Sequence, residues 1–435
     1  MTRFGSIKRT LSSSFSYLTS YVNSATGSLF PQRRRDESRI LIRELPDPLI
    51  MLDGTRVYNE RSWNERRRPE ILELFRMHVY GRSPARSVPT PSNITNLDEH
   101  ALDGTALRKE VIIRLVGKPY EHLMTLILYL PNNRLKRGDR VPLFLGLNFF
   151  GNQTIPEDPG ISISANCPPN TSIARGRPPA MNRCFKSSSW PVEFLLENGY
   201  GLASIYYGDI VPDHSDALGF GIHRWFLENE LIRQTPDSWG AIGGWAWGLS
   251  RAMDYLQSDK DVDSNKIVLI GHSRLGKAAL WAGAQDERFA MVIANESGCG
   301  GAALSRRKIG ETVASINSSF PHWFCSNFKS YNENEARLPV DQHELISLIA
   351  PRPVYIASAQ LDFDADPEWE FLGAKLASPV YQLFGKAGLP ADRPPALDVP
   401  IMGTIGYHVR RGRHGIIIFD WTQFVKFADK HLINR

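Results

Sequence analysis

Lys266-Ile-Val-Leu-Ile-Gly-His-Ser-Arg-Leu-Gly-Lys277 is the most informative segment of this sequence. Its apolar run Ile-Val-Leu-Ile is typical of a buried strand, and the alanine-rich residues 278–284 beyond it favour a helix. A strand, a sharp turn and a helix around a serine form a nucleophile elbow, which exposes Ser273 at the end of the strand. The usual pattern is Gly-x-Ser-x-Gly, whereas Leu275 holds the last glycine position here and Gly276 follows it. A serine that caps an ordinary helix has the same pattern, but the flanking strand and helix favour the nucleophile.

Predicted strands and helices alternate on both sides of this stretch. This alternation predicts βαβ units, and therefore an α/β fold with a mostly parallel central sheet flanked by helices on both faces, a three-layer sandwich. Active sites on such sheets lie beyond the carboxyl ends of the strands. The predicted strands are 111–115, 123–130, 141–147, 201–206, 266–270, 291–294, 354–359 and 399–402, and the predicted helices are 63–80, 240–256, 275–284 and 421–432.

Composition limits the classes of function. A chain of 435 residues, 42% of them hydrophobic, can bury a large core. Its 51 basic and 46 acidic residues leave a formal charge of +5, which is too small and too scattered to indicate a nucleic-acid partner. No apolar run reaches the roughly 18 residues of a membrane span, so no membrane partner is expected. We expect a monomer that acts on a small or neutral substrate.

The first residues differ in composition from the rest of the chain. Residues 1–35 contain no acidic group and are rich in serine and arginine, which predicts a disordered or processed tail over 1–40 and one catalytic domain over 41–435. Serine and threonine interrupt 11–22, so a signal peptide and an unprocessed leader both stay open. The cysteines have neither metal-ligand spacing nor the density of a disulfide scaffold, and the simplest interpretation is buried apolar side chains. These are Cys167, Cys184, Cys299 and Cys325.

A histidine base is expected late in the chain, because a serine elbow of this kind is followed first by an acid and then by the histidine. His414 follows the basic turn 410–413 and precedes the last predicted helix. His408 competes with it, but lies beside the apolar segment 401–407 and is more easily structural. Arg274 follows the nucleophile, where a backbone N–H contributes to an oxyanion hole, and its guanidinium could lower the barrier by roughly 3 to 4 kcal/mol.

Two acids compete to orient the imidazole. Glu296 follows the predicted strand 291–294, and Asp362 follows the predicted strand 354–359. Either carboxylate would hydrogen-bond one ring nitrogen and so fix the tautomer in which the other nitrogen takes the serine proton. The residues alone do not decide between them. Serine, acid and base in this order predict a serine esterase of the α/β-hydrolase fold.

Two longer motifs accompany these residues, Gly271-His-Ser-Arg-Leu-Gly-Lys277 and Asn295-Glu-Ser-Gly-Cys-Gly-Gly-Ala302. Together with His414 they resemble the glucuronoyl esterases of carbohydrate esterase family 15, especially the bacterial branch. This resemblance implies hydrolysis, by an acyl-enzyme mechanism, of the ester between 4-O-methyl-glucuronic acid on glucuronoxylan and lignin alcohols. It also implies a secreted or periplasmic enzyme that needs no metal or organic cofactor. The resemblance extends to residues 67–75, 146–152, 206–209, 240–250 and 345–353.

The resemblance also implies roles for single residues. Arg274 would stabilise the oxyanion, while Lys277 and Glu311 would hydrogen-bond the hydroxyls of the uronate ring. Glu296 stands at the usual acid position of the family. Asp362 stands at the alternative position that some bacterial members use, so both acids can be present together.

This chain departs from the family pattern at two places. A tryptophan that contacts the sugar in many members would fall near Asp364, and Trp369 is the nearest candidate for that contact. Fungal members carry a cysteine where His272 stands, bridged to a partner near the base. No cysteine lies near His414 in this sequence, so that bridge is absent.

Two other functions stay open. An acetyl-xylan or other carbohydrate esterase needs the same serine, base and acid, and only the substrate pocket separates the two activities. A carbohydrate-binding protein that kept the fold and lost catalysis is the alternative outside enzymes, since fold does not imply function.

Overall fold

The computed structural model describes residues 45–84, 91–116, 122–164, 183–216, 219, 221–228, 234–307 and 310–433. Contacts divide the chain into two units, Met1–Leu45 and Pro46–Arg435. The predicted tail 1–40 and Cys167 lie outside the described residues. The strands are β1 (Ser92–His100), β2 (Ala106–Val116), β3 (His122–Pro131), β4 (Val141–Asn148), β5 (Gly201–Tyr206), β6 (Val262–His272), β7 (Met291–Asn295), β8 (Val354–Ala359), β9 (Ile401–Met402) and β10 (Ile405–Arg410).

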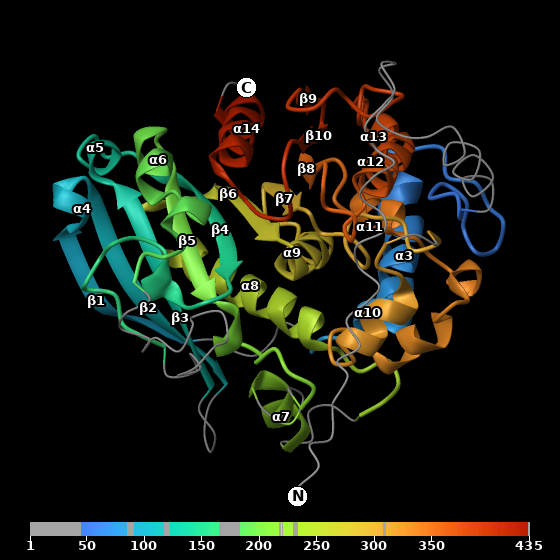
Figure 1. The fold of residues 1–435 in the computed structure, drawn as a ribbon, viewed down its shortest axis with the longest axis horizontal. Helices are drawn as coiled ribbons and strands as arrows, with labels where there is room; N and C mark the ends of the chain where they lie inside the picture. The colour runs from blue at the N-terminus through green and yellow to red at the C-terminus, as the bar shows by residue number, and fades with distance from the viewer. Residues whose placement is uncertain are drawn as a thin grey trace, which may run out of the picture. The chain divides into compact units, whose positions relative to one another are not determined.

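These strands form one sheet in the order β1-β2-β3-β5-β4-β6-β7-β8-β10-β9 (Figure 1). The run from β5 to β10 is parallel throughout. Antiparallel pairs join β1, β2 and β3 to one side of this run, and β9 to the other. The prediction of a mostly parallel central sheet is therefore confirmed.

Helices cover both faces of the sheet because apolar residues point alternately to each side of its inner strands. In β6, Ile267 and Leu269 belong to one buried core, and Val268 and Ile270 belong to a second. The helices are α2 (Glu60–Ser62), α3 (Arg68–Phe75), α4 (Ala101–Gly104), α5 (Asn132–Leu135), α6 (Val192–Glu197), α7 (Gly221–Glu228), α8 (Ala241–Ser258), α9 (Arg274–Gln285), α10 (Val313–Ser319), α11 (Gln342–Ser347), α12 (Pro367–Leu376), α13 (Ser378–Leu383) and α14 (Ile418–Ala428).

The two cores separate the helices into two layers. Residues of α3, α8 and α9 pack in the first core, and residues of α6 and α14 pack in the second. Figure 1 shows α6 and α14 on one side of the sheet and α8 and α9 on the other. Among the described residues, no helix has both the length and the apolar character needed to cross a bilayer. The three-layer arrangement agrees with the prediction.

Most predicted elements form, and the differences lie in polar segments. The predicted helix 63–80 is one helical run in which α3 is flanked by π-helical turns, Trp63–Arg67 and Arg76–Tyr80. The predicted strand 399–402 is only the two-residue β9. The elements that were not predicted include the strands β1 and β10 and the helix α12, together with the shorter helices α4, α5, α6, α7, α10, α11 and α13.

The elbow at Ser273 explains the shifted glycine of the sequence motif. Ser273 lies between β6 and α9 with φ 58° and ψ −130°, a strained left-handed conformation. A Cβ on Gly276 would lie 3.0 Å from the Cβ of Ser297, so this helix turn needs a glycine to approach its neighbour. Leu275, at the usual glycine position, is buried in the core instead.

Candidate active site

The candidate residues follow four parallel strands at the points where the strands end. Ser273 follows β6, Glu296 follows β7, Asp362 follows β8 and His414 follows β10. Because β6, β7, β8 and β10 are successive neighbours in the sheet, their carboxyl ends lie at one edge. The fold therefore carries the four side chains to the same place from positions that are far apart in sequence.

The imidazole of His414 contacts both candidate acids. Its Nδ1 lies 2.6 Å from Oδ2 of Asp362 and 3.1 Å from Oε2 of Glu296. Both carboxylates are buried, while the His414 side chain is 44% exposed and so accessible to a substrate. One Nδ1 proton points at two acceptors, and the shorter contact makes Asp362 the stronger partner.

These contacts shift the proton affinity of the groups. Burial lowers the pKa of His414, but the hydrogen bonds and charges of Asp362 and Glu296 outweigh it and raise this pKa to about 10. Burial raises the pKa of Glu296, against the opposing effects of His414 and Arg410. The imidazolium is therefore the stable form of His414 at neutral pH in the absence of substrate.

His272, the residue before Ser273, lies beside the candidate base. The rings of His272 and His414 are 4.6 Å apart, centroid to centroid. Among the described residues no hydrogen bond joins the hydroxyl of Ser273 to His414, and such bonds are often long in substrate-free enzymes and shorten on binding. Burial, and then the charge of His414, lower the pKa of His272 well below its usual value, so this second imidazole stays neutral.

Arg274 is held at the mouth of the site by a charge and an aromatic surface. Its guanidinium pairs with Asp213 and lies 4.8 Å from the ring centre of Trp323. Asp213 also accepts hydrogen bonds from Nε2 of His322 at 2.8 Å and from Nε1 of Trp323 at 2.7 Å. The Nε of Arg274 is buried and has no hydrogen-bond partner among the described residues.

Lys277, which lies three residues after Arg274 on α9, is brought together with Glu311. Nζ of Lys277 lies 3.7 Å from Oε2 of Glu311 and donates a 2.7 Å hydrogen bond to the carbonyl of Ser297. The same ammonium lies 5.8 Å from the ring centre of Trp323. Trp369 lies on α12, is 6% exposed and has no recorded contact with this pair. Its part in sugar contact stays a prediction, with little ring surface available for it.

Aromatic side chains form a row from the surface to His272, which lies beside the candidate base. Phe185, which is 40% exposed, lies 5.1 Å from Phe150, and Phe150 lies 6.0 Å from Phe149. Phe149 lies 6.2 Å from His272. Nζ of Lys186 lies 4.9 Å from the ring centre of Phe150 and 5.3 Å from that of Phe185, at the outer end of the row. The row offers an apolar surface that leads to Ser273.

Two other arrangements near the site are a structural role for His408 and a metal site. His408 is fully buried in β10, between the hydroxyl of Tyr355 and Oδ1 of Asp420, as a structural histidine would be. His272, Glu296 and His414 place potential ligand atoms within 4.8 Å of one another. A cation there would meet the Arg410 guanidinium, whose Nη2 already lies 2.6 Å from Glu296. The donor set fits a proton relay better than a metal.

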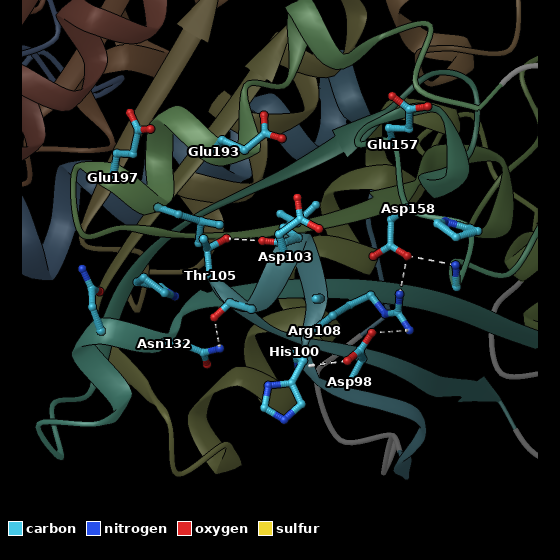
Figure 2. Close-up of a pocket in the computed structure, with 18 of the residues that line it drawn as sticks. Asp98, His100, Asp103, Thr105, Arg108, Asn132, Glu157, Asp158, Glu193 and Glu197 are labelled. Atoms are coloured by element: carbon cyan, nitrogen blue, oxygen red, sulfur yellow. Dashed lines mark hydrogen bonds and ion pairs between the residues drawn. The ribbon is translucent and has the colours of Figure 1, made fainter.

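A separate cavity of about 1090 Å³ lies between α4 and α6. Figure 2 shows carboxylates around it, with Arg108 between Asp98 and Asp158. Nη1 of Arg108 lies 2.5 Å from Oδ1 of Asp158, so its charge is already paired. None of the candidate catalytic residues lines this cavity, and the active site is defined by the side chains that converge on His414.

Three residues of the site were not predicted from the sequence: Asp213, Trp323 and Arg410. Asp213 lies in the loop that follows β5, and the rule that ligands bind beyond strand ends could have pointed to it. Arg410 ends β10, a strand that was not predicted. Trp323 follows α10 in a segment without any strand-end signal.

Known proteins are similar to this chain in fold and in sequence. The family model described as glucuronyl esterase, fungi, matches residues 232–385. Carbohydrate esterase MZ0003, from an unknown prokaryotic organism, is 45% identical over 401 residues, which cover 91% of each chain. The solved glucuronoyl esterase from Solibacter usitatus is 43% identical, with a TM-score of 0.82 over 89% of this chain and 97% of that one. A promiscuous CE15 esterase from a marine bacterial metagenome is 45% identical, with a TM-score of 0.83 over the same shares. The chain therefore belongs to the glucuronoyl esterases of carbohydrate esterase family 15 and is a carboxylic ester hydrolase of the α/β-hydrolase fold.

Proposed function

We propose that this esterase cleaves the ester between 4-O-methyl-glucuronic acid on glucuronoxylan and an alcohol of lignin. The observation that carries the proposal is the contact of His414 with two buried carboxylates beside the strained turn of Ser273. Such a set supplies a base, its orienting acid and an exposed nucleophile for acyl transfer. Because the substrate is part of the plant cell wall, we also propose that the enzyme is secreted or periplasmic.

The reaction follows from the positions of these groups. The Ser273 hydroxyl attacks the ester carbonyl, and Nε2 of His414 takes its proton while Nδ1 stays bonded to Asp362. The carbonyl oxygen gains charge, which the backbone N–H and the guanidinium of Arg274 stabilise. His414 then gives the proton to the leaving alcohol, and water repeats the sequence to release the uronate and the free serine.

Two groups of side chains support the proposed substrate. Lys277 and Glu311 offer a donor and an acceptor to the hydroxyls of a sugar ring. The row that begins at Phe185 offers an apolar surface to an aromatic alcohol. A small acyl group such as acetate would not reach Lys277 and Glu311 and would leave them bonded only within the protein, which favours the uronate over the acetyl ester.

A comparison of two acyl groups on the same alcohol tests the proposal. We expect benzyl glucuronate to be hydrolysed with a much higher kcat/KM than benzyl acetate, because only the uronate reaches Lys277 and Glu311. Both rates are measured with the wild-type enzyme and with Ser273→Ala as the control. Hydrolysis of the acetate alone would support an acetyl esterase, and binding of xylan oligosaccharides without any hydrolysis would support a non-catalytic protein.

The raised pKa of His414 predicts activity that increases toward alkaline pH. The imidazole must be neutral to accept the serine proton. The value of kcat/KM therefore rises as the pH approaches the His414 pKa of about 10. Asp362→Asn removes the stronger hydrogen bond, which lowers this pKa and moves the ascending limb of the profile toward about 6.5. Glu296→Gln should move the limb in the same direction by less, because its contact with Nδ1 is longer.

Each of these two single variants keeps one carboxylate, so its loss of rate is partial, and the double variant loses far more. The surface variant Asp392→Asn, whose side chain is 93% exposed, is the control for a lost carboxylate. If the ascending limb of the pH profile had the same midpoint in the double variant as in the wild type, neither carboxylate would act on His414.

The sugar contact is tested at Glu311. Glu311→Gln keeps the size of the side chain and removes its charge, so KM for benzyl glucuronate should rise about tenfold or more, the scale of a charged hydrogen bond. The kcat/KM for benzyl acetate should stay unchanged, as should both values in the exposed control Glu65→Gln. Equal losses on both esters would place Glu311 outside the sugar site.

A further inference from the structure

Arg410 lies buried beneath the turn that carries His414. It is the last residue of β10 and is 2% exposed. Its Nε donates to both oxygens of Asp420, at 3.1 and 3.0 Å, and its Nη2 donates to Oε1 of Glu296 at 2.6 Å. The guanidinium thus joins a carboxylate from α14 to one from the end of β7.

The same guanidinium holds the turn itself. Nη1 donates to the carbonyl of Arg411 at 3.1 Å, and Nη2 donates to the carbonyls of Arg413 at 3.1 Å and Gly415 at 2.6 Å. His414 stands between the last two of these residues. Both peptide groups that flank the base are therefore bonded to one planar, rigid cation.

Gly415 receives two further bonds from the end of β7. Its N–H donates to Oε2 of Glu296 at 2.7 Å, and its carbonyl accepts from Nδ2 of Asn295 at 3.1 Å. That same Nδ2 lies 2.9 Å from Nδ1 of His272, which precedes the nucleophile. One network of hydrogen bonds therefore connects the base turn to the strand that ends at Ser273.

We infer that Arg410 is a positioning residue that fixes the turn of His414, and with it the distance between base and nucleophile. This inference rests on the proposed function, in which His414 is the base. It also divides the work of the two acids. Glu296 is committed to Arg410 and Gly415 and braces the turn, while Asp362 makes the shorter contact with Nδ1 and orients the imidazole.

Lysine cannot replace this arginine. An ammonium carries the same charge, but it is a single point with three donors and cannot reach two carboxylates and three carbonyls at once. Arg410→Lys therefore keeps the charge beside Glu296 and removes the geometry. Arg411→Lys is the matched control on the neighbouring residue, because the Arg411 side chain is 74% exposed and pairs with Asp398 at the surface.

We expect Arg410→Lys to lower kcat by about 100-fold, the scale of a misplacement of roughly 1 Å, with KM within about twofold of wild type. The ascending limb of the pH profile should also move to lower pH, because a loosened turn weakens the bonds from Nδ1 to Asp362 and Glu296. The other charged or titratable groups near His414 are His272, which stays neutral, and position 410, where lysine keeps the positive charge of the arginine. Arg411→Lys should match wild type in all three quantities.

A merely structural role would reduce the fraction of active enzyme without moving the pH limb. That fraction is measured by titrating Ser273 with an organophosphorus ester. A fall in kcat explained by the titre alone, with an unmoved limb, would overturn the inference, as would wild-type behaviour. Should Arg410→Lys fail to fold, Asp420→Asn loosens the same guanidinium from the other side, and we expect a smaller shift in the same direction; an unmoved limb there also overturns it.

The test separates this inference from the proposed function. A wild-type enzyme that does not hydrolyse benzyl glucuronate would refute the substrate. The rate at which the organophosphorus ester modifies Ser273 would still report on the base, and a pH dependence identical in wild type and Arg410→Lys would refute the role of Arg410.

Discussion

The imidazole of His414 is held by buried carboxylates, and the rest of the site depends on this interaction. Asp362 and Glu296 reach the same ring nitrogen from the ends of two neighbouring strands, at 2.6 and 3.1 Å. A parallel sheet makes this possible because every strand delivers its last side chain to one edge. The cost of burying two carboxylates is offset by Arg410, which pairs with Glu296, and by the charge of the imidazole itself.

Strands with continuous apolar runs could be predicted from the sequence, and polar strands could not. The predicted bounds of β5 and β8 agree with the structure because both are fully buried and end at turn residues. β1 is an exposed edge strand with two large apolar residues, Ile94 and Leu97, so it carries no core pattern. β10 includes His408 and Arg410, whose polar groups are paired inside the fold, and no local pattern reveals such pairing.

The same limit applies to the site. Ser273, Glu296, Asp362 and His414 could be named because each follows a predicted strand or precedes a predicted helix. The structure brings Glu296 and Asp362 to His414, and it places Ser273 at the end of β6 in the same sheet. The separate roles of Asp362 and Glu296 could not be predicted, because they depend on the difference between two distances to Nδ1 of His414. The contacts of Arg274 could not be predicted either, because Asp213 and Trp323 meet this guanidinium from segments that are far apart in the sequence.

The pairing of Ser273 with His414 can be measured by labelling with an organophosphorus ester, followed by mass spectrometry of the modified peptides. We expect the label to lie on Ser273, to form faster as the pH rises, and to form orders of magnitude more slowly in His414→Ala, because nucleophile and base act as a unit. A label on another residue, or an unchanged rate in His414→Ala, would contradict this pairing.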